Sequence, residues 1–211
     1  MGTVLLAHGA GAPMDSPFME TMAAGLTGHG WRVLRFEFPY MAQSRRDGRR
    51  RPPDRLPKLL DAFRAEVAAL QGQGPLLIGG KSLGGRVATL LVDELAASAA
   101  VCGCLCLGYP FHPPGRPDQL RTAHLAALST PTLILQGERD SFGRRDEVEG
   151  YALAAAVTVE WIPAGDHSFR PLRSSGRSEA DNLGLAIDRA DRFGRRCLSP
   201  EPSGLEGIRP G

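Results

Sequence analysis

The chain has 211 residues, of which 42% are hydrophobic and 23% charged, and its formal net charge is +2. This length suits one domain with a single sizeable core, and the composition is ordinary for a soluble globular protein. No apolar run approaches the roughly 20 residues that cross a bilayer, and the small net charge gives no indication of a nucleic-acid or membrane partner.

Short apolar runs alternate with longer amphipathic stretches along the chain. In chain order they predict strand 3–7, helix 18–28, strand 31–38, helix 56–70, strand 75–78, helix 83–97, strand 99–107, strand 131–136, helix 144–156, strand 157–162 and helix 179–196. Most of these strands are continuously apolar, which is typical of strands covered on both faces. The alternation therefore predicts a three-layer α/β/α sandwich with about six mostly parallel strands and no large cap domain.

Three segments lack such a pattern and are predicted to be irregular. Residues 41–57 form a long loop rich in arginine and proline, and residues 109–119 form a proline- and glycine-rich loop that is a candidate for a short lid. Residues 198–211 are predicted to be a disordered tail, so the domain comprises residues 1–197.

The cysteines and the first residues indicate the compartment. Cys102, Cys104 and Cys106 alternate within one apolar run, where same-face neighbours do not suit disulfide geometry, and buried core positions are expected instead. Residues 1–7 contain neither a basic region nor a cleavage site, so they are interpreted as a first strand rather than a signal peptide. Reducing, cytoplasmic surroundings are the expectation.

The strongest functional motif is Gly80-Lys81-Ser82-Leu83-Gly84, which matches Gly-x-Ser-x-Gly between a predicted strand and a helix. Glycines on both sides leave room for a sharp turn that exposes the serine hydroxyl at the start of the helix. Because a glycine-rich strand-to-helix turn also occurs without catalysis, the motif needs support from other residues.

That support comes from the loops that follow the last two predicted strands. A serine hydroxyl is a weak nucleophile and needs a base, and His167 follows the last strand while Asp140 follows the strand before it. Ser82, Asp140 and His167 would then meet at the carboxyl end of a parallel sheet as nucleophile, orienting acid and base. The alternatives for the acid and the base are Asp166, Glu138, His8, His29, His112 and His124.

An oxyanion site is predicted beside the serine. Residues 9–12 carry no bulky side chain, so their backbone amides can approach a substrate closely. The two donors are assigned to the amides of Leu83 and Ala10, with an ordinary glycine turn as the alternative interpretation of residues 9–12.

Two other resemblances to ligand-binding motifs fail on spacing. The phosphate-binding P-loop needs a glycine where Pro75 stands, and the dinucleotide fingerprint needs one where Met14 stands. No His, Cys and carboxylate spacing suggests a metal site.

Two further features surround the predicted site. Six arginines between residues 45 and 55 form either a solvated loop or a surface that attracts anionic substrates or an acidic partner. Several aromatic residues and one methionine lie in loops at the carboxyl end of the predicted strands. They either line a substrate pocket or pack the loops: Tyr40, Met41, Tyr109, Phe111, Phe142 and Phe169.

Together these segments resemble the α/β-hydrolase superfamily, and more narrowly its small lid-poor members related to dienelactone hydrolase. Residues 8–12, 39–41, 79–86, 108–114 and 137–143 look like one branch of bacterial hydrolases, whose eukaryotic relatives include a testis-expressed protein and a subunit of a histone acetyltransferase complex. The resemblance implies the α/β-hydrolase fold, the same triad and oxyanion roles, and hydrolysis without a cofactor. The chain departs from the expected family pattern in two ways. The strand before residues 8–12 is the first one predicted, so the two usual leading strands are expected to be absent, and serine replaces the cysteine of dienelactone hydrolases.

The expected function is that of a serine hydrolase acting on a small-molecule carboxylic ester, or on a thioester as the next choice, as a monomer or a homodimer. The alternative, from another class, is a protein-interaction module on a hydrolase scaffold with little turnover.

Overall fold

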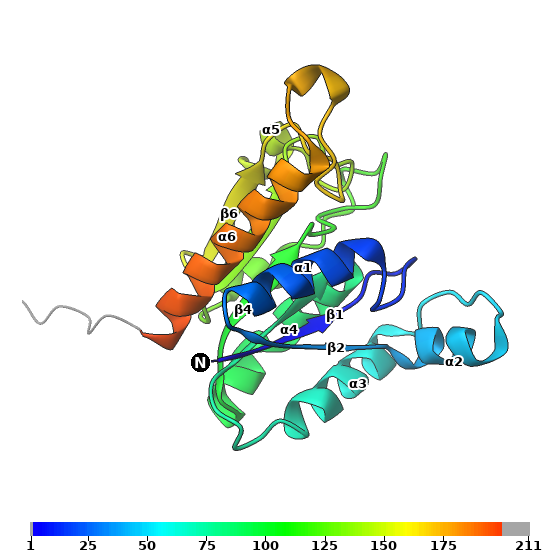
Figure 1. Cartoon of the computed structure of the whole chain (residues 1–211), viewed down its shortest axis with the longest axis vertical. Helices are drawn as coiled ribbons and strands as arrows, with labels where there is room; N and C mark the ends of the chain where they lie inside the picture. The colour runs from blue at the N-terminus through cyan, green and yellow to red at the C-terminus, as the bar shows by residue number, and fades with distance from the viewer. Residues whose placement is uncertain (1, 200–211) are drawn as a thin grey trace, which may run out of the picture.

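The protein is described here by a computed structural model, which covers residues 2–199. Most of the predicted tail, residues 200–211, lies outside the described residues, whereas Leu198 still belongs to the last helix. The described chain forms one twisted sheet with helices on both of its faces (Figure 1).

Six strands form the sheet of the described chain, and every neighbouring pair is parallel, in the order β2-β1-β3-β4-β5-β6. Their bounds are β1 Thr3–Ala7, β2 Arg32–Phe36, β3 Leu76–Lys81, β4 Val101–Leu107, β5 Thr132–Gly137 and β6 Val157–Ile162. The interior strands are buried along almost their whole length because helices cover both faces, whereas the edge strands β2 and β6 are only partly buried.

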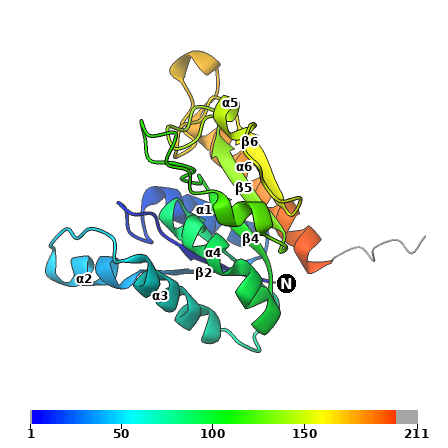
Figure 2. The same cartoon turned by 180° about the vertical axis from the view of Figure 1, so that it is seen from behind.

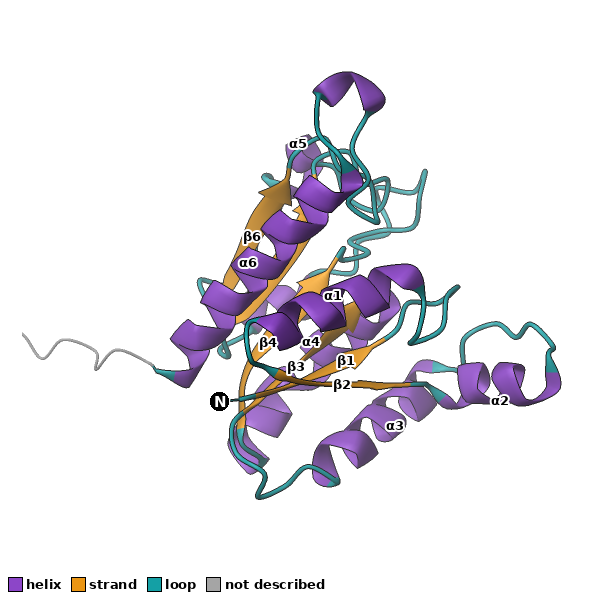
Figure 3. Ribbon diagram, in the orientation of Figure 1, coloured by secondary structure: helices purple, strands orange, loops and turns teal. Residues whose placement is uncertain are grey.

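Helices α1 (Pro17–Gly28) and α6 (Glu179–Leu198) cover one face of the sheet, and α3 (Leu56–Ala68) and α4 (Leu83–Ser98) cover the other (Figures 1, 2 and 3). Helix α2 (Pro39–Asp47) projects from the body beside β2, and the short α5 (Arg145–Val148) follows β5. Two 3₁₀ helices span Ala123–Ala127 and Arg173–Ser175. These layers confirm the predicted three-layer α/β/α sandwich of the α/β-hydrolase type, without a cap domain in the described chain.

Two hydrophobic cores hold the layers together, one on each face. Because successive side chains of a strand point to opposite faces, Leu5 belongs to the core beneath α3 and α4, while Leu6 belongs to the core beneath α1 and α6. Phe63 of α3 and Met22 of α1 are fully buried on these two sides. Each such side chain contributes about 1.5–3 kcal/mol when it leaves water. None of the described helices is both long and apolar enough to cross a lipid bilayer.

The arginine-rich segment begins with a helix where a loop is expected. Helix α2 starts at Pro39, whose fixed φ suits a first helical turn, and ends before Gly48, which adopts a left-handed conformation with φ of 69°. Only residues 48–55 are irregular. The prediction of a loop over residues 41–57 is therefore wrong for its first half.

The helix predicted over residues 144–156 is also too long. Helix α5 ends at Val148, and the chain then turns at Gly150, a poor helix former. Tyr151, Leu153 and Ala154 pack against the core instead of continuing the helix. The backbone N–H of Ala154 donates to Leu125 at 3.0 Å, which fixes the extended path into β6.

Candidate active site

The nucleophile candidate sits on a strained turn between β3 and α4. Ser82 has φ of 50° and ψ of −108°, a conformation that costs a non-glycine residue of order 1–3 kcal/mol. A Cβ on Gly80 or on Gly84 would overlap the carbonyl oxygen of Ala7, so both glycines are required where the turn passes β1. The motif therefore stands in the strand–turn–helix context that Gly-x-Ser-x-Gly needs.

The structure brings Asp140 and His167 into a direct hydrogen bond. Nδ1 of His167 donates to Oδ2 of Asp140 at 2.6 Å, and the carboxylate is fully buried. Because Nδ1 carries the hydrogen that it donates to Asp140, Nε2 is the nitrogen that can accept a proton. The ring of Phe142 lies against the imidazole with centroids 4.3 Å apart, which limits how far the ring can turn.

A buried amide that the sequence interpretation missed holds Asp140. The side-chain amide of Gln136 donates to Oδ2 of Asp140 at 2.9 Å, and its oxygen accepts from the backbone N–H of Tyr109 at 2.7 Å. The other carboxylate oxygen accepts from the backbone N–H of Phe142 at 2.9 Å. Gln136 is the one amide in the otherwise apolar run of β5, and that position was the available signal.

The loop that carries His167 is held in a second strained conformation. Ala164 and Phe169 have φ of 53° and 67°, and with Ser82 they are the non-glycine residues of the described chain with positive φ. Asp166 accepts from the backbone N–H groups of Ser168 and Arg170 at 2.8 and 3.0 Å. Asp166 therefore caps its own loop instead of orienting the imidazole.

The other alternative acid, Glu138, also has a structural role. Its carboxylate accepts from the backbone N–H of Ala164 at 2.8 Å and pairs with Arg145 at 3.2 Å. It thereby ties the loop after β5 to the loop after β6. The loops that carry Asp140 and His167 are therefore joined by hydrogen bonds.

Burial lowers the pKa of His167 below its ordinary value of 6.5. The hydrogen bond that His167 donates to Asp140 opposes this shift, and the positive charge of Lys81 adds to it. Asp140 and Asp166 also oppose it through their negative charges. The imidazole therefore stays neutral, and able to accept a proton, at a lower pH than an ordinary histidine does.

Ser82 and His167 line the same pocket, which has a volume of about 460 Å³. No hydrogen bond joins these two side chains in the described structure, and catalytic hydrogen bonds commonly tighten only when substrate is bound. The wall is largely apolar and is built from the loop after β1, the start of α1, the base loop and the start of α6. Its residues are Gly9, Ala10, Gly11, Ala12, Ser16, Pro17, Phe18, Met19, Thr21, Lys81, Ser82, Phe142, His167, Ser168, Arg170, Glu179 and Leu183.

The loop after β1 has the properties expected of an oxyanion site. The backbone N–H groups of Ala10 and Leu83 donate to no other group in the described part of the chain, so both remain available. His8 fixes the loop from below: its Nδ1 donates to the carbonyl of Gly9 at 2.6 Å, and its Nε2 accepts from the backbone N–H of Phe38 at 3.1 Å. The Tyr40 hydroxyl donates to the carbonyl of Ala10 at 3.1 Å.

Only Phe142 among the six predicted pocket residues lines the pocket. Tyr109 and Phe111 are fully buried in the core, and the side chain of Phe169 is buried beneath Phe18. Tyr40 is buried because α2 turns it inward, and Met41 packs against the same core. The assignment of these five side chains to the pocket is corrected accordingly, and the real apolar wall comes from α1 and α6.

The remaining histidines lie away from the pocket. His8, one of the alternative bases, is buried beneath residues 9–12. His112 contacts Glu147 at 3.3 Å, His29 lies beside Asp188 and Asp191, and burial lowers the pKa of His124 to about 4. Within residues 2–199, no group of three or more His, Cys, Asp and Glu side chains is arranged to hold a metal ion.

The sequence profile of the α/β-hydrolase domain family matches residues 1–195, so the chain belongs to this family. Solved structures that share its fold include the following three. A serine hydrolase described as lacking a lid, from Xanthomonas campestris, is 21% identical with a TM-score of 0.67 and covers 95% of this chain and 84% of its own. A dienelactone hydrolase from Anabaena variabilis is 20% identical with a TM-score of 0.64, covering 93% and 86%. An esterase domain from Rhodothermus marinus is 18% identical with a TM-score of 0.63, covering 92% and 86%.

Proposed function

We propose that the protein is a serine hydrolase that cleaves carboxylic esters through an acyl-enzyme formed on Ser82. The observation that supports this most directly is the 2.6 Å hydrogen bond between His167 and a fully buried Asp140, in loops that share a pocket with Ser82. Membership of the α/β-hydrolase family and the esterase and serine hydrolase among its structural neighbours point the same way.

The proposed reaction has two steps. In the first, the Ser82 hydroxyl attacks the ester carbonyl while Nε2 of His167 takes its proton, and the imidazolium then gives that proton to the departing alcohol. In the second, His167 takes a proton from water, the hydroxide attacks the acyl-enzyme, and Ser82 regains its proton as the acid leaves. Asp140 keeps Nδ1 protonated throughout.

The backbone amides of Leu83 and Ala10 are assigned as the donors that stabilise the negative charge developing on the carbonyl oxygen. Both N–H groups are without a partner among residues 2–199, and the first belongs to the N-terminus of α4, where the helix dipole favours negative charge. Removal of one such donor typically costs about a hundredfold or more in kcat.

The pocket favours a substrate of small to medium size with an apolar portion. Its volume of about 460 Å³ lies in the range of small-molecule sites, and Phe18, Met19 and Leu183 make its wall apolar. An apolar acyl or alcohol group of moderate length fits this description. Thioesters are the next candidates, because the same acyl-enzyme chemistry applies to them.

Labelling with a fluorophosphonate probe tests the proposal, because the probe forms a covalent bond only with an activated serine. We expect native protein to be labelled and to hydrolyse p-nitrophenyl esters of increasing chain length with an optimum at short to medium chains. Ser82→Ala should remove the label and lower kcat by about 10⁴-fold or more.

The matched control is Ser168→Ala, because Ser168 lines the same pocket but lies off the nucleophile turn. It should retain the label. No labelling of the folded native protein, or equal labelling of Ser82→Ala, would contradict the proposal and favour the interaction-module alternative.

A further inference from the structure

Lys81, the residue immediately before Ser82, turns its side chain into the protein. The residue is only 9% exposed. A Cβ on Gly9 would lie 3.5 Å from Cγ of Lys81, so the alkyl stem packs beneath the oxyanion loop. The side chain thus starts at the nucleophile turn and runs under the loop that is assigned to oxyanion binding.

The ammonium group at the end of this side chain contacts the loop of the base. Nζ donates to the carbonyl oxygen of His167 at 2.5 Å and lies 5.3 Å from the centre of the Phe18 ring. Gly108, with φ of 70°, leaves the space for it, because a Cβ there would lie 2.9 Å from Nζ. One cation therefore touches the end of β4, the start of α1 and the base loop.

No carboxylate neutralises this cation directly. Asp140 and Asp166 act on it through their charges, but Lys81 forms no salt bridge with any described residue. A buried ammonium is costly unless it is bound, and an apolar side chain of the same length would fill the space at less cost. Structural packing alone therefore does not explain a charged residue at this position.

The composition adds a second argument. The chain contains 23 arginines but only two lysines, Lys58 and Lys81, and Lys58 is an exposed residue whose side chain is 59% accessible. A compact ammonium reaches a single carbonyl in a closed space, whereas a planar guanidinium is larger and presents a fork of donors. The geometry around Gly108 and Phe18 suits the smaller cation.

We propose that Lys81 is a positioning residue for the hydrolytic reaction, whose ammonium anchors the main chain of His167 to the strand end that carries Ser82. Nucleophile and base are then held on one frame, although they come from strands β3 and β6 that are not neighbours in the sheet. This inference rests on the proposed serine hydrolase function.

The same charge acts on the imidazole. Burial lowers the pKa of His167 most, Lys81 lowers it further, and Asp140 and Asp166 raise it. Removal of the ammonium should therefore raise the pKa of His167, and the base becomes neutral only at higher pH. A lysine whose ammonium lay far from the imidazole would leave this pKa unchanged when an apolar residue of similar length replaced it.

The test compares Lys81→Met with the matched control Lys58→Met. In Lys81→Met we expect kcat to fall by about 10- to 100-fold with KM within about threefold, and the acid limb of kcat/KM to move up by about one pH unit. Lys58→Met should leave both unchanged. An acid limb and a kcat equal to those of the native protein in folded Lys81→Met would overturn the inference.

A second measurement needs no variant and remains decisive if Lys81→Met does not fold. Burial lowers the pKa of Lys81 to about 8, and carbon-13-labelled lysine gives only two side-chain signals in this chain. We expect the buried signal to titrate near that pH and kcat/KM to decline with it, because a neutral amine holds the carbonyl less strongly. A constant kcat/KM through that titration contradicts the inference.

These outcomes are separable from failure of the proposed function. If native protein is not labelled by the fluorophosphonate, the serine hydrolase proposal fails. If native protein is labelled, and Lys81→Met is labelled at the same rate with the same pH dependence, only the role of Lys81 fails.

Discussion

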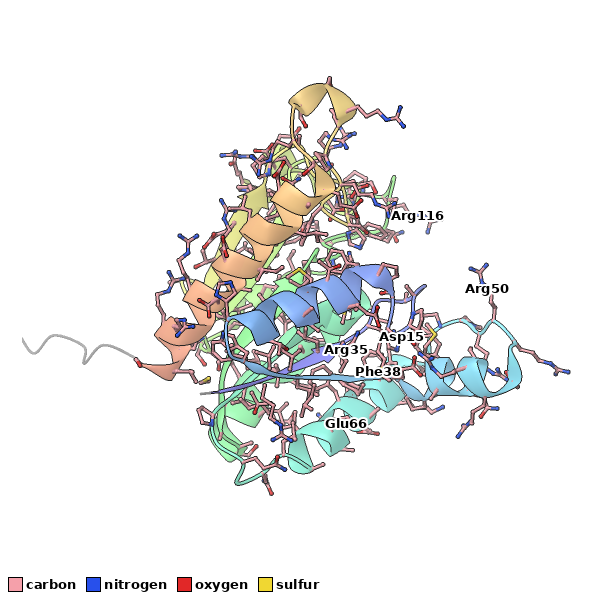
Figure 4. All side chains as sticks on the ribbon, viewed as in Figure 1. Asp15, Arg35, Phe38, Arg50, Glu66 and Arg116 are labelled. Carbon is pink, nitrogen blue, oxygen red and sulfur yellow. The ribbon has the colours of Figure 1, made fainter. Side chains whose placement is uncertain are left out.

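The loops that carry Asp140 and His167 and the arm formed by α2 and residues 48–55 handle charge in opposite ways. Asp140 is fully buried, and its two oxygens accept hydrogen bonds from three different residues. On the arm, charges pair at the surface, as Arg45 does with Asp15 and Glu37, while Arg50 points into solvent from the tip (Figure 4). The difference indicates which charged residues determine stability and activity. An exposed ion pair contributes about 0–1 kcal/mol to stability, whereas breaking a buried network costs several times more.

The largest effect is expected at the buried acid. Asp140→Asn replaces an oxygen that accepts from Nδ1 of His167 and should favour the wrong imidazole tautomer, lowering kcat by about 10³- to 10⁴-fold. Steady-state hydrolysis of a p-nitrophenyl ester measures this loss. Asp166→Asn is the control on the neighbouring loop and should lose less than about tenfold, so similar losses in the two variants would remove the distinction between orienting acid and loop cap.

An intermediate effect on kcat is expected at Gln136, which contacts Asp140. Gln136→Leu removes the amide that donates to Asp140 and the oxygen that accepts from Tyr109, so kcat should fall by about tenfold and stability by about 1–3 kcal/mol. Thermal unfolding and ester hydrolysis report the two losses separately. Gln43→Leu on the arm should change neither, and a Gln136→Leu enzyme with native kcat would show that Asp140 needs no such support.

The smallest effect is expected on the arm itself. Arg49 and Arg50 form no salt bridge with any residue of the described chain, so a role for their charges would have to act on a ligand at a distance. Replacing both with glutamine should lower kcat/KM for an ester with a free carboxylate by about two- to threefold at low salt and leave a neutral ester unaffected. Rates that do not differ between the two esters, or that do not depend on salt, would remove any role in attracting anions.

The parts of the fold and site that could be predicted are those determined by residues close together in the sequence. Short, mostly apolar runs located all six strands, and the residues after them indicated the candidates Ser82, Asp140 and His167. The start of α2 at Pro39 and its end at Gly48 carried a local signal too, but the charged residues between them obscured the helical pattern. Local chemistry was therefore sufficient for the frame and for the candidate triad.

The contacts around the site could not be predicted in this way. Whether Tyr109 and Phe111 face a pocket or the core depends on which strand packs beside the loop, and that is settled only by long-range packing. The second partner of Gln136, Tyr109, likewise lies 27 positions away along the chain, and Lys81 contacts His167 across 86 positions. The pocket wall from α1 and α6 follows from helix placement, which sequence periodicity does not determine.

Three residues have a strained backbone, and they limit how far the stability of this protein can be raised: Ser82, Ala164 and Phe169. Glycine adopts their backbone angles without penalty, so exchanging any of them for glycine relieves local strain. At Ser82 the same exchange deletes the hydroxyl on which the proposed reaction depends. Selection for thermal tolerance alone would therefore drive this site toward inactivity, and stabilisation is better sought in the sheet edges and the arm than in the turns around the pocket.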